Sequence, residues 1–99
     1  MPHELRLSSR AEADIAAAFD WYEQRLPGLG TDFVRCVDAT ISLAQCSPQF
    51  FRQRHAEHRL AMTPRFPYAV YFIWDEAAHF VSIRRVLHFS QNASAHLDR

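Results

Sequence analysis

The spacing of apolar residues changes once along this chain, and that change limits the folds it can adopt. Between residues 11 and 44, apolar side chains recur at three- and four-residue steps, which is the period of an amphipathic helix. Pro27-Gly28-Leu29-Gly30 interrupts the pattern, and Ser47-Pro48 ends it. We therefore predict two helices, joined by a tight turn into an antiparallel hairpin.

A short strand precedes this hairpin. Residues 3–7 alternate polar and apolar side chains, and Ser9-Arg10-Ala11-Glu12 then matches the capping box that opens a helix. The first helix is expected to begin at Ser9. The predicted apolar stripes are Ala11, Ile15, Ala18, Phe19, Tyr22 and Leu26 on the first helix, and Phe33, Val37, Ile41 and Ala44, flanked by Val34 and Leu43, on the second.

The second half of the chain has the pattern of strands. We expect an exposed loop over residues 49–58, a strand near residues 59–63 and a second strand over residues 68–74. The 68–74 segment is apolar on both faces and dense in β-forming residues, which indicates a central strand covered on both sides. Residues 75–78 fit a hairpin loop that leads into a last strand over residues 79–88.

The last strand contains an irregularity. Strict alternation would place Arg85 on the same face as Val81 and Ile83, so we predict a β-bulge near Arg84 and Arg85 that turns Val86 or Leu87 inward. The tail over residues 92–99 is polar and is expected to form a weak helical turn or two at most.

These elements predict one α+β domain over residues 1–99. The order is β-α-α-β-β-β, with the helical hairpin packed on one face of a mainly antiparallel sheet. The chain has 99 residues, of which 48% are hydrophobic, and that is enough for one core but not for two. It contains no apolar run of membrane-spanning length and no signal-peptide pattern at its start, so a cytoplasmic location is expected.

Neither a metal nor a cofactor is expected. Cys36 and Cys46 fall on one predicted helix, roughly 15 Å apart, which predicts free thiols packed in a reducing compartment. The segment His55-Ala56-Glu57-His58 has two imidazoles and a carboxylate but makes a poor zinc site. Ser8 and Ser9 suit helix caps better than nucleophiles.

Charge is divided unevenly along the chain. Residues 1–50 contain seven acidic residues and four arginines, whereas residues 51–99 contain four acidic residues and seven arginines. The formal net charge is zero, and this weakens the case for general nucleic-acid binding, which depends on many phosphate contacts.

Four segments resemble the RelE/ParE toxin superfamily in order and spacing. They are Ala13-Asp14-Ile15 with Trp21-Tyr22, Pro27-Gly28-Leu29-Gly30 with Phe33, Arg65-Phe66-Pro67-Tyr68 with Tyr71, and Arg85-Val86-Leu87-His88. The resemblance extends from Leu5 to about His88. It implies the toxin of a type II toxin–antitoxin pair, a role in bacterial or plasmid stability, and an acidic antitoxin partner with a DNA-binding N-terminus.

The resemblance leaves two targets open. RelE-like members cleave ribosome-bound mRNA, and His88 with Arg85 and Arg65 would then be catalytic, as acid or base and as cations. ParE-like members instead inhibit DNA gyrase by binding. In place of an arginine-rich segment after the histidine, this chain has Phe89-Ser90-Gln91. That departure, the lack of lysine and the neutral charge favour gyrase inhibition without catalysis.

Antitoxin or target binding is expected to use the arginines and tyrosines of the strands. The candidates are Arg59, Arg65, Tyr68, Tyr71, Arg84 and Arg85. We expect Arg59, Arg65 and Arg85 to pair with antitoxin carboxylates. Structural roles are the competing interpretation: core packing for the tyrosines, a bulge flank for the arginines and backbone hydrogen bonds for His88. A non-toxic binding module that kept the fold is a further alternative.

Overall fold

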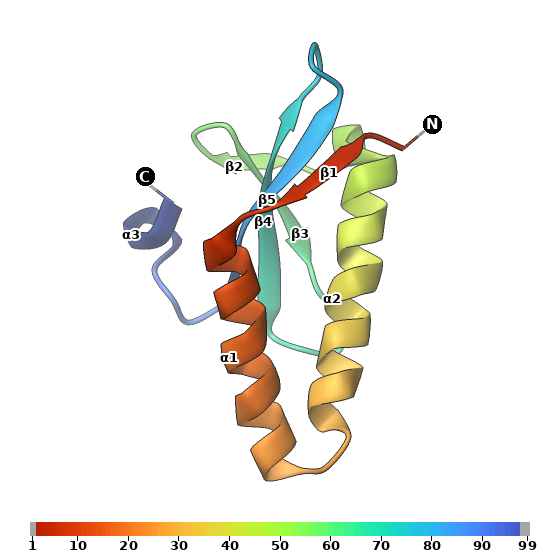
Figure 1. Cartoon of the computed structure of the whole chain (residues 1–99). Helices are drawn as coiled ribbons and strands as arrows, with labels where there is room; N and C mark the ends of the chain where they lie inside the picture. The colour runs from red at the N-terminus through yellow and green to blue at the C-terminus, as the bar shows by residue number, and fades with distance from the viewer. Residues whose placement is uncertain (1, 98–99) are drawn as a thin grey trace.

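A computed structural model describes residues 2–97 and shows a helical hairpin lying against a five-stranded sheet (Figure 1). The predicted α+β class and the hairpin on one face of a mainly antiparallel sheet are confirmed. In chain order the elements are β1 (Glu4–Leu7), α1 (Ser9–Arg25), α2 (Leu29–Cys46), the 3₁₀ turn η1 (Pro48–Phe50), β2 (Gln53–His55), β3 (His58–Met62), β4 (Tyr68–Asp75), β5 (Phe80–His88) and α3 (Ala93–Leu97).

The strand order in the sheet is β1-β5-β4-β3-β2, so β4 is central as its apolar sequence predicted. β1 pairs in parallel with β5, and the other neighbouring strands are antiparallel. The segment 49–58 is not a plain loop, because it contains η1 and the additional strand β2. This strand was not predicted because its side chains are polar. It pairs with β3 around a tight turn in which Ala56 has a positive φ of 49°.

Helix α1 begins at Ser9 as predicted, but Ser8 is the capping residue. The Ser8 hydroxyl accepts a hydrogen bond from the amide of Ala11 at 3.0 Å and donates one to the carbonyl of Arg84 at 2.7 Å. The Ser8 amide continues the β1–β5 pairing by donating to Ile83. The capping box predicted at Ser9 is therefore wrong by one residue, because the strand pairing runs directly into the cap.

The two helices approach closely at the turn. Gly28 has a φ of +92°, and the amides of Gly28 and Gly30 both donate to the carboxylate of Glu23. A Cβ on Gly30 would lie 2.7 Å from the carbonyl oxygen of Phe19, so the contact requires glycine. Leu26, predicted to be part of the apolar stripe, is 58% exposed because α1 ends at Arg25, one residue before it.

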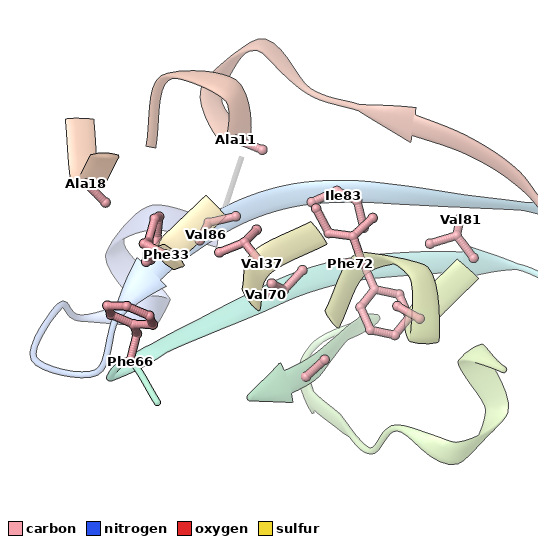
Figure 2. Close-up of a cluster of buried hydrophobic side chains, with 13 residues drawn as sticks. Ala11, Ala18, Phe33, Val37, Phe66, Val70, Phe72, Val81, Ile83 and Val86 are labelled. Atoms are coloured by element: carbon pink, nitrogen blue, oxygen red, sulfur yellow. The ribbon is translucent and has the colours of Figure 1, made fainter. Parts of the chain in front are cut away.

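The core lies between the helical hairpin and the sheet (Figure 2). Phe33 and Val37 of α2 are fully buried, as are Val70 and Phe72 of β4 and Ile83 of β5. On β4 the even-numbered residues face this core, which leaves the odd-numbered ones for the opposite face of the sheet.

The predicted β-bulge is present on β5. Tyr71 pairs with Arg85 and Phe72 pairs with Ile83, so Arg84 is the extra residue. The shift places Val86 in the core in the position that strict alternation would have given to Arg85. The bulge therefore moves both arginines out of the hydrophobic core.

The tail forms α3, whose Leu97 is 5% exposed and whose helix contacts β5 and β2. Asp98 and Arg99 lie outside the described residues. Cys36 and Cys46 are both on α2, as predicted, and neither forms a disulfide. Cys36 is half-buried, whereas Cys46 is exposed and does not have the buried packing role expected of it. Within residues 2–97, none of the helices combines the length and hydropathy that a bilayer-spanning segment requires.

Candidate functional site

A partly buried ion pair joins the first helix to the bulge. The Asp14 carboxylate accepts hydrogen bonds from Nε of Arg85 at 2.7 Å and from its NH2 nitrogen at 2.9 Å, and both side chains are only 14% exposed. A third hydrogen bond comes from the backbone amide of Val86 at 3.0 Å. The hydrogen bonds to Asp14 raise the pKa of Arg85. Arg85 is thus held inside the fold by a bidentate contact.

Beside this pair lies an aromatic groove of about 390 Å³, on the α1 side of the sheet. The residues that line it come from α1, from the start of β4 and from the end of β5 with the residues that follow. They are Asp14, Ala17, Ala18, Trp21, Tyr22, Tyr68, Val86, His88, Ser90 and Gln91. Trp21 is 50% exposed, with the guanidinium of Arg25 stacked over its ring at 3.4 Å from the centroid.

The tyrosines of the aromatic groove are kept protonated by their surroundings. Burial raises the pKa of Tyr22 and that of Tyr68, and the neighbouring Tyr22 and Asp14 raise that of Tyr68 further. The Tyr68 ring packs edge-on against Phe33 at 4.9 Å and against His88 at 5.1 Å. Tyr68 therefore offers a neutral hydroxyl and an aromatic wall, which suits binding by contact.

His88 has its Nδ1 atom already occupied. The amide of Ser90 donates to this nitrogen at 3.0 Å, and the Ser90 hydroxyl lies 2.8 Å from it. Because a backbone amide can only donate, Nδ1 must be the acceptor, and the proton of the neutral ring is on Nε2. In this tautomer Nε2 can donate a hydrogen bond, while the Nδ1 lone pair accepts from Ser90.

The opposite face of the sheet carries a second hollow of about 570 Å³, which we call the cationic hollow. Its lining residues come from the β2–β3 hairpin, β4, the bulge and α3, and they are Arg54, His55, Ala56, Glu57, His58, Ile73, Arg84, Ser94 and Leu97. The Tyr71 ring lies 5.9 Å from that of His55. Burial raises the pKa of Tyr71, while the positive charge of Arg54 lowers it by a smaller amount.

Two of the predicted binding arginines are engaged elsewhere. Arg59 donates to the carbonyl of Phe51 at 2.6 Å, and its guanidinium lies 5.2 Å from the centre of the Trp74 ring. Arg65, in the turn before β4, is paired with Asp32 at 3.6 Å. Arg59 therefore fastens η1 to the sheet, and Arg65 joins the β3–β4 turn to α2.

The structure brings some of the predicted residues together and separates others. Tyr68 and His88 share the aromatic groove, whereas Tyr71 and Arg84 belong to the other face of the sheet. Arg85 lines neither of these two hollows and is bound to Asp14 of α1. The proposed catalytic residues His88, Arg85 and Arg65 have separate partners in Ser90, Asp14 and Asp32, rather than facing one common point.

The pairing of Asp14 with Arg85 was not predicted from the sequence. The position of Asp14 three residues after Ala11 and four before Ala18 places it beside two buried alanines, on the apolar side of α1. A carboxylate at such a position requires a partner. Strict alternation along β5 would place Arg85 on the core face, where it also requires a partner. An acidic residue on the apolar side of α1 and an arginine at a core-facing position of β5 could together have indicated the ion pair. The contribution of Arg54 and His55 had no such signal, because it depends on the unexpected strand β2.

No group of histidine, cysteine and carboxylate side chains in residues 2–97 is arranged to hold a metal ion. His55 and His58 are close, but the Nδ1 atom of His58 is hydrogen-bonded to the His55 carbonyl at 3.1 Å. Glu57 lies in the turn between them. The segment therefore closes the β2–β3 hairpin.

No family model and no curated protein matches the sequence. Solved structures do match the fold. A chain of the chromosomal ParDE toxin–antitoxin system from P. aeruginosa matches with a TM-score of 0.76 at 18% identity, covering 87% of this chain and 95% of that one. A chain of the toxin–antitoxin complex RelBE2 from Mycobacterium tuberculosis matches with a TM-score of 0.59 at 20% identity, covering 89% and 92%. At these identities the likeness shows a shared fold: this chain folds like the matched chains of the ParDE and RelBE2 systems.

Proposed function

We propose that this chain is the toxin of a type II toxin–antitoxin pair and that it acts by binding a target, without catalysis. DNA gyrase is the proposed target and a cognate antitoxin the proposed partner. The proposed location is the cytoplasm, and the proposed role is bacterial or plasmid stability. The fold supports the toxin assignment, and the likeness is greater to the ParDE chain than to the RelBE2 chain, with TM-scores of 0.76 and 0.59.

One observation supports binding without catalysis: the side chains that RNA cleavage would need are already bound to other groups of this chain. Asp14 neutralises Arg85, and the Ser90 amide occupies Nδ1 of His88. Cleavage of RNA requires a free base for the 2′-hydroxyl and cations for the developing phosphorane charge. A groove lined with Trp21, Tyr22 and Tyr68 has instead the aromatic character of protein-binding surfaces.

A RelE-like mRNA endonuclease is the second candidate, and the cationic hollow is what favours it. Arg54 and Arg84 could neutralise a phosphate there, and His55 and Tyr71 could move protons. Under this alternative the catalytic site lies on the sheet face opposite the aromatic groove.

Induction of the chain without its partner distinguishes these candidates. We expect growth arrest, rescue by co-expression of the neighbouring acidic reading frame, and intact messages in primer extension. Codon-spaced cuts that disappear in an Arg84→Gln variant would overturn the binding mechanism in favour of cleavage. Harmless accumulation of folded protein would overturn the toxin assignment and support a binding module that kept the fold.

A further inference from the structure

The cationic hollow contains two arginines, Arg54 and Arg84, whose charges form no ion pair within residues 2–97. Arg84 reaches it because the bulge removes this residue from the regular alternation of β5. Arg54 reaches it from β2, the short strand at the sheet edge. Bulges that redirect a side chain are frequent beside functional sites.

Arg54 and Arg84 differ from the other strand and turn arginines in their partners. Arg59, Arg65 and Arg85 are bound to Phe51, Asp32 and Asp14, respectively. Among residues 2–97, neither Arg54 nor Arg84 has a carboxylate within ion-pair distance. Glu57 is the one acidic side chain among the described residues that line the hollow, so the local charge is positive.

The hollow also has an apolar component. Ile73 of β4 and the buried Leu97 of α3 line it together with the two arginines. A surface that combines guanidinium groups with apolar side chains fits a peptide that carries both carboxylates and an aliphatic residue. Carboxylates accept paired hydrogen bonds from guanidinium groups.

The charge of the whole chain favours a short acidic segment over a nucleic acid. The formal net charge is zero, and the first half of the chain, which includes the helical hairpin, carries seven of the eleven acidic residues. A polyanion gains affinity from many phosphate contacts over a long surface, whereas an acidic peptide can use a local patch.

We propose that the cationic hollow binds a short acidic peptide segment of the antitoxin, with carboxylates on Arg54 and Arg84 and an aliphatic side chain against Ile73 and Leu97. This inference rests on the proposed toxin function for the identity of the partner. It replaces Arg59, Arg65 and Arg85 as the residues that receive the antitoxin carboxylates, because those three are already bound within the chain.

Fluorescence anisotropy of the purified full chain with a labelled peptide of alternating glutamate and serine, containing one central leucine, tests the proposal. We expect saturable binding at low salt, and about tenfold weaker binding in Arg54→Gln and in Arg84→Gln, equivalent to about 1.4 kcal/mol each. Arg35→Gln is the matched control, because Arg35 is an exposed arginine of α2, and it should bind as the wild type does. If Arg84→Gln fails to fold, Arg54→Gln alone tests the proposal, because a substitution at the exposed Arg54 should not disturb folding.

Three outcomes would overturn the proposal: equal binding of a peptide with glutamine in place of glutamate, unchanged binding in both hollow variants, or tighter binding of a single-stranded RNA through the same arginines. Growth arrest, measured separately, distinguishes the failure of the two proposals. A harmless chain that binds the peptide through Arg54 and Arg84 contradicts the toxin function alone. If the chain arrests growth but binds the peptide equally well in both arginine variants, only the proposed peptide-binding surface is contradicted.

Discussion

Asp14 connects α1 to β5 through one carboxylate. It accepts from the Arg85 side chain and from the Val86 amide, which lies on the edge of β5 beyond the last residue paired with β1. The next outward amide, that of His88, donates to the side chain of Gln91 at 2.8 Å. These two side chains satisfy an edge that would otherwise be open to pairing with another strand.

Replacing Asp14 by alanine should cost about 3–5 kcal/mol of folding free energy, because it leaves the Arg85 guanidinium partly buried without a counter-ion. Urea denaturation measures the change. The control is Asp32→Ala, which breaks the exposed pair with Arg65 and should cost less than about 1 kcal/mol. Equal costs for the two variants would mean that the Asp14–Arg85 pair does not hold helix and bulge together.

The tyrosines predict how stability depends on pH. The folded-state pKa values of Tyr22, Tyr68 and Tyr71 are raised above the ordinary value of 10.0. Their phenols therefore ionise first in the unfolded chain, so this stability is complete below about pH 10 and is lost as the pH rises through the folded-state values. Urea denaturation from neutral to alkaline pH should show a smaller loss in Tyr68→Phe than in the wild type. An identical loss would show that Tyr68 does not contribute.

At the scale of elements, the start of α1 depends on Ser8. Ser8→Ala should lower the free energy of unfolding by about 1–2 kcal/mol, because it removes the cap on Ala11 and the hydrogen bond to Arg84. Ser9→Ala is the control, and it should change stability by less than about 0.5 kcal/mol, since Ser9 is exposed. Denaturant unfolding of both variants checks the assignment, and the reverse order of effects would restore Ser9 as the cap.

The hairpin between α1 and α2 depends on Gly30. Gly30→Ala should destabilise the protein by about 1–3 kcal/mol despite the higher helix propensity of alanine, because the new Cβ would meet the Phe19 carbonyl at 2.7 Å. A thermal unfolding scan measures the loss. In Gly28→Ala the added Cβ has open space, and the expected cost of about 1 kcal/mol comes only from the positive φ. A stabilised Gly30→Ala variant would contradict the close approach of the helices.

Helices, central strand and bulge were predictable because their patterns are local. The helical period through Phe33, Val37 and Ile41 is uninterrupted, and the buried pair Val81 and Ile83 conflicts with Arg85 unless the strand is irregular. The β2 strand was not predictable, because its three residues are polar and its partner is set by the tertiary fold. The capping box was placed at Ser9 instead of Ser8 for a related reason, because the long-range bonds of Ser8 to β5 decide which serine caps the helix.

At the scale of the whole molecule, the sheet separates two surfaces of different chemistry. The aromatic groove is lined by residues of α1, and the cationic hollow is lined on the other face by residues that include Ser94 and Leu97 of α3. Residues of both surfaces were predicted to form one site, because spacing along a strand does not show which face a bulge gives to each side chain. The division allows target binding at one surface and antitoxin binding at the other.

The most direct test of the central claim, that the chain inhibits gyrase by binding, is the supercoiling activity of purified gyrase titrated with the purified chain. We expect supercoiling to fall as the wild-type chain is added and to be retained in the presence of Trp21→Ala, because the groove supplies contact. The His88→Gln variant should still inhibit, because inhibition by binding needs no proton transfer. Full supercoiling at saturating amounts of the folded wild-type chain would contradict the account.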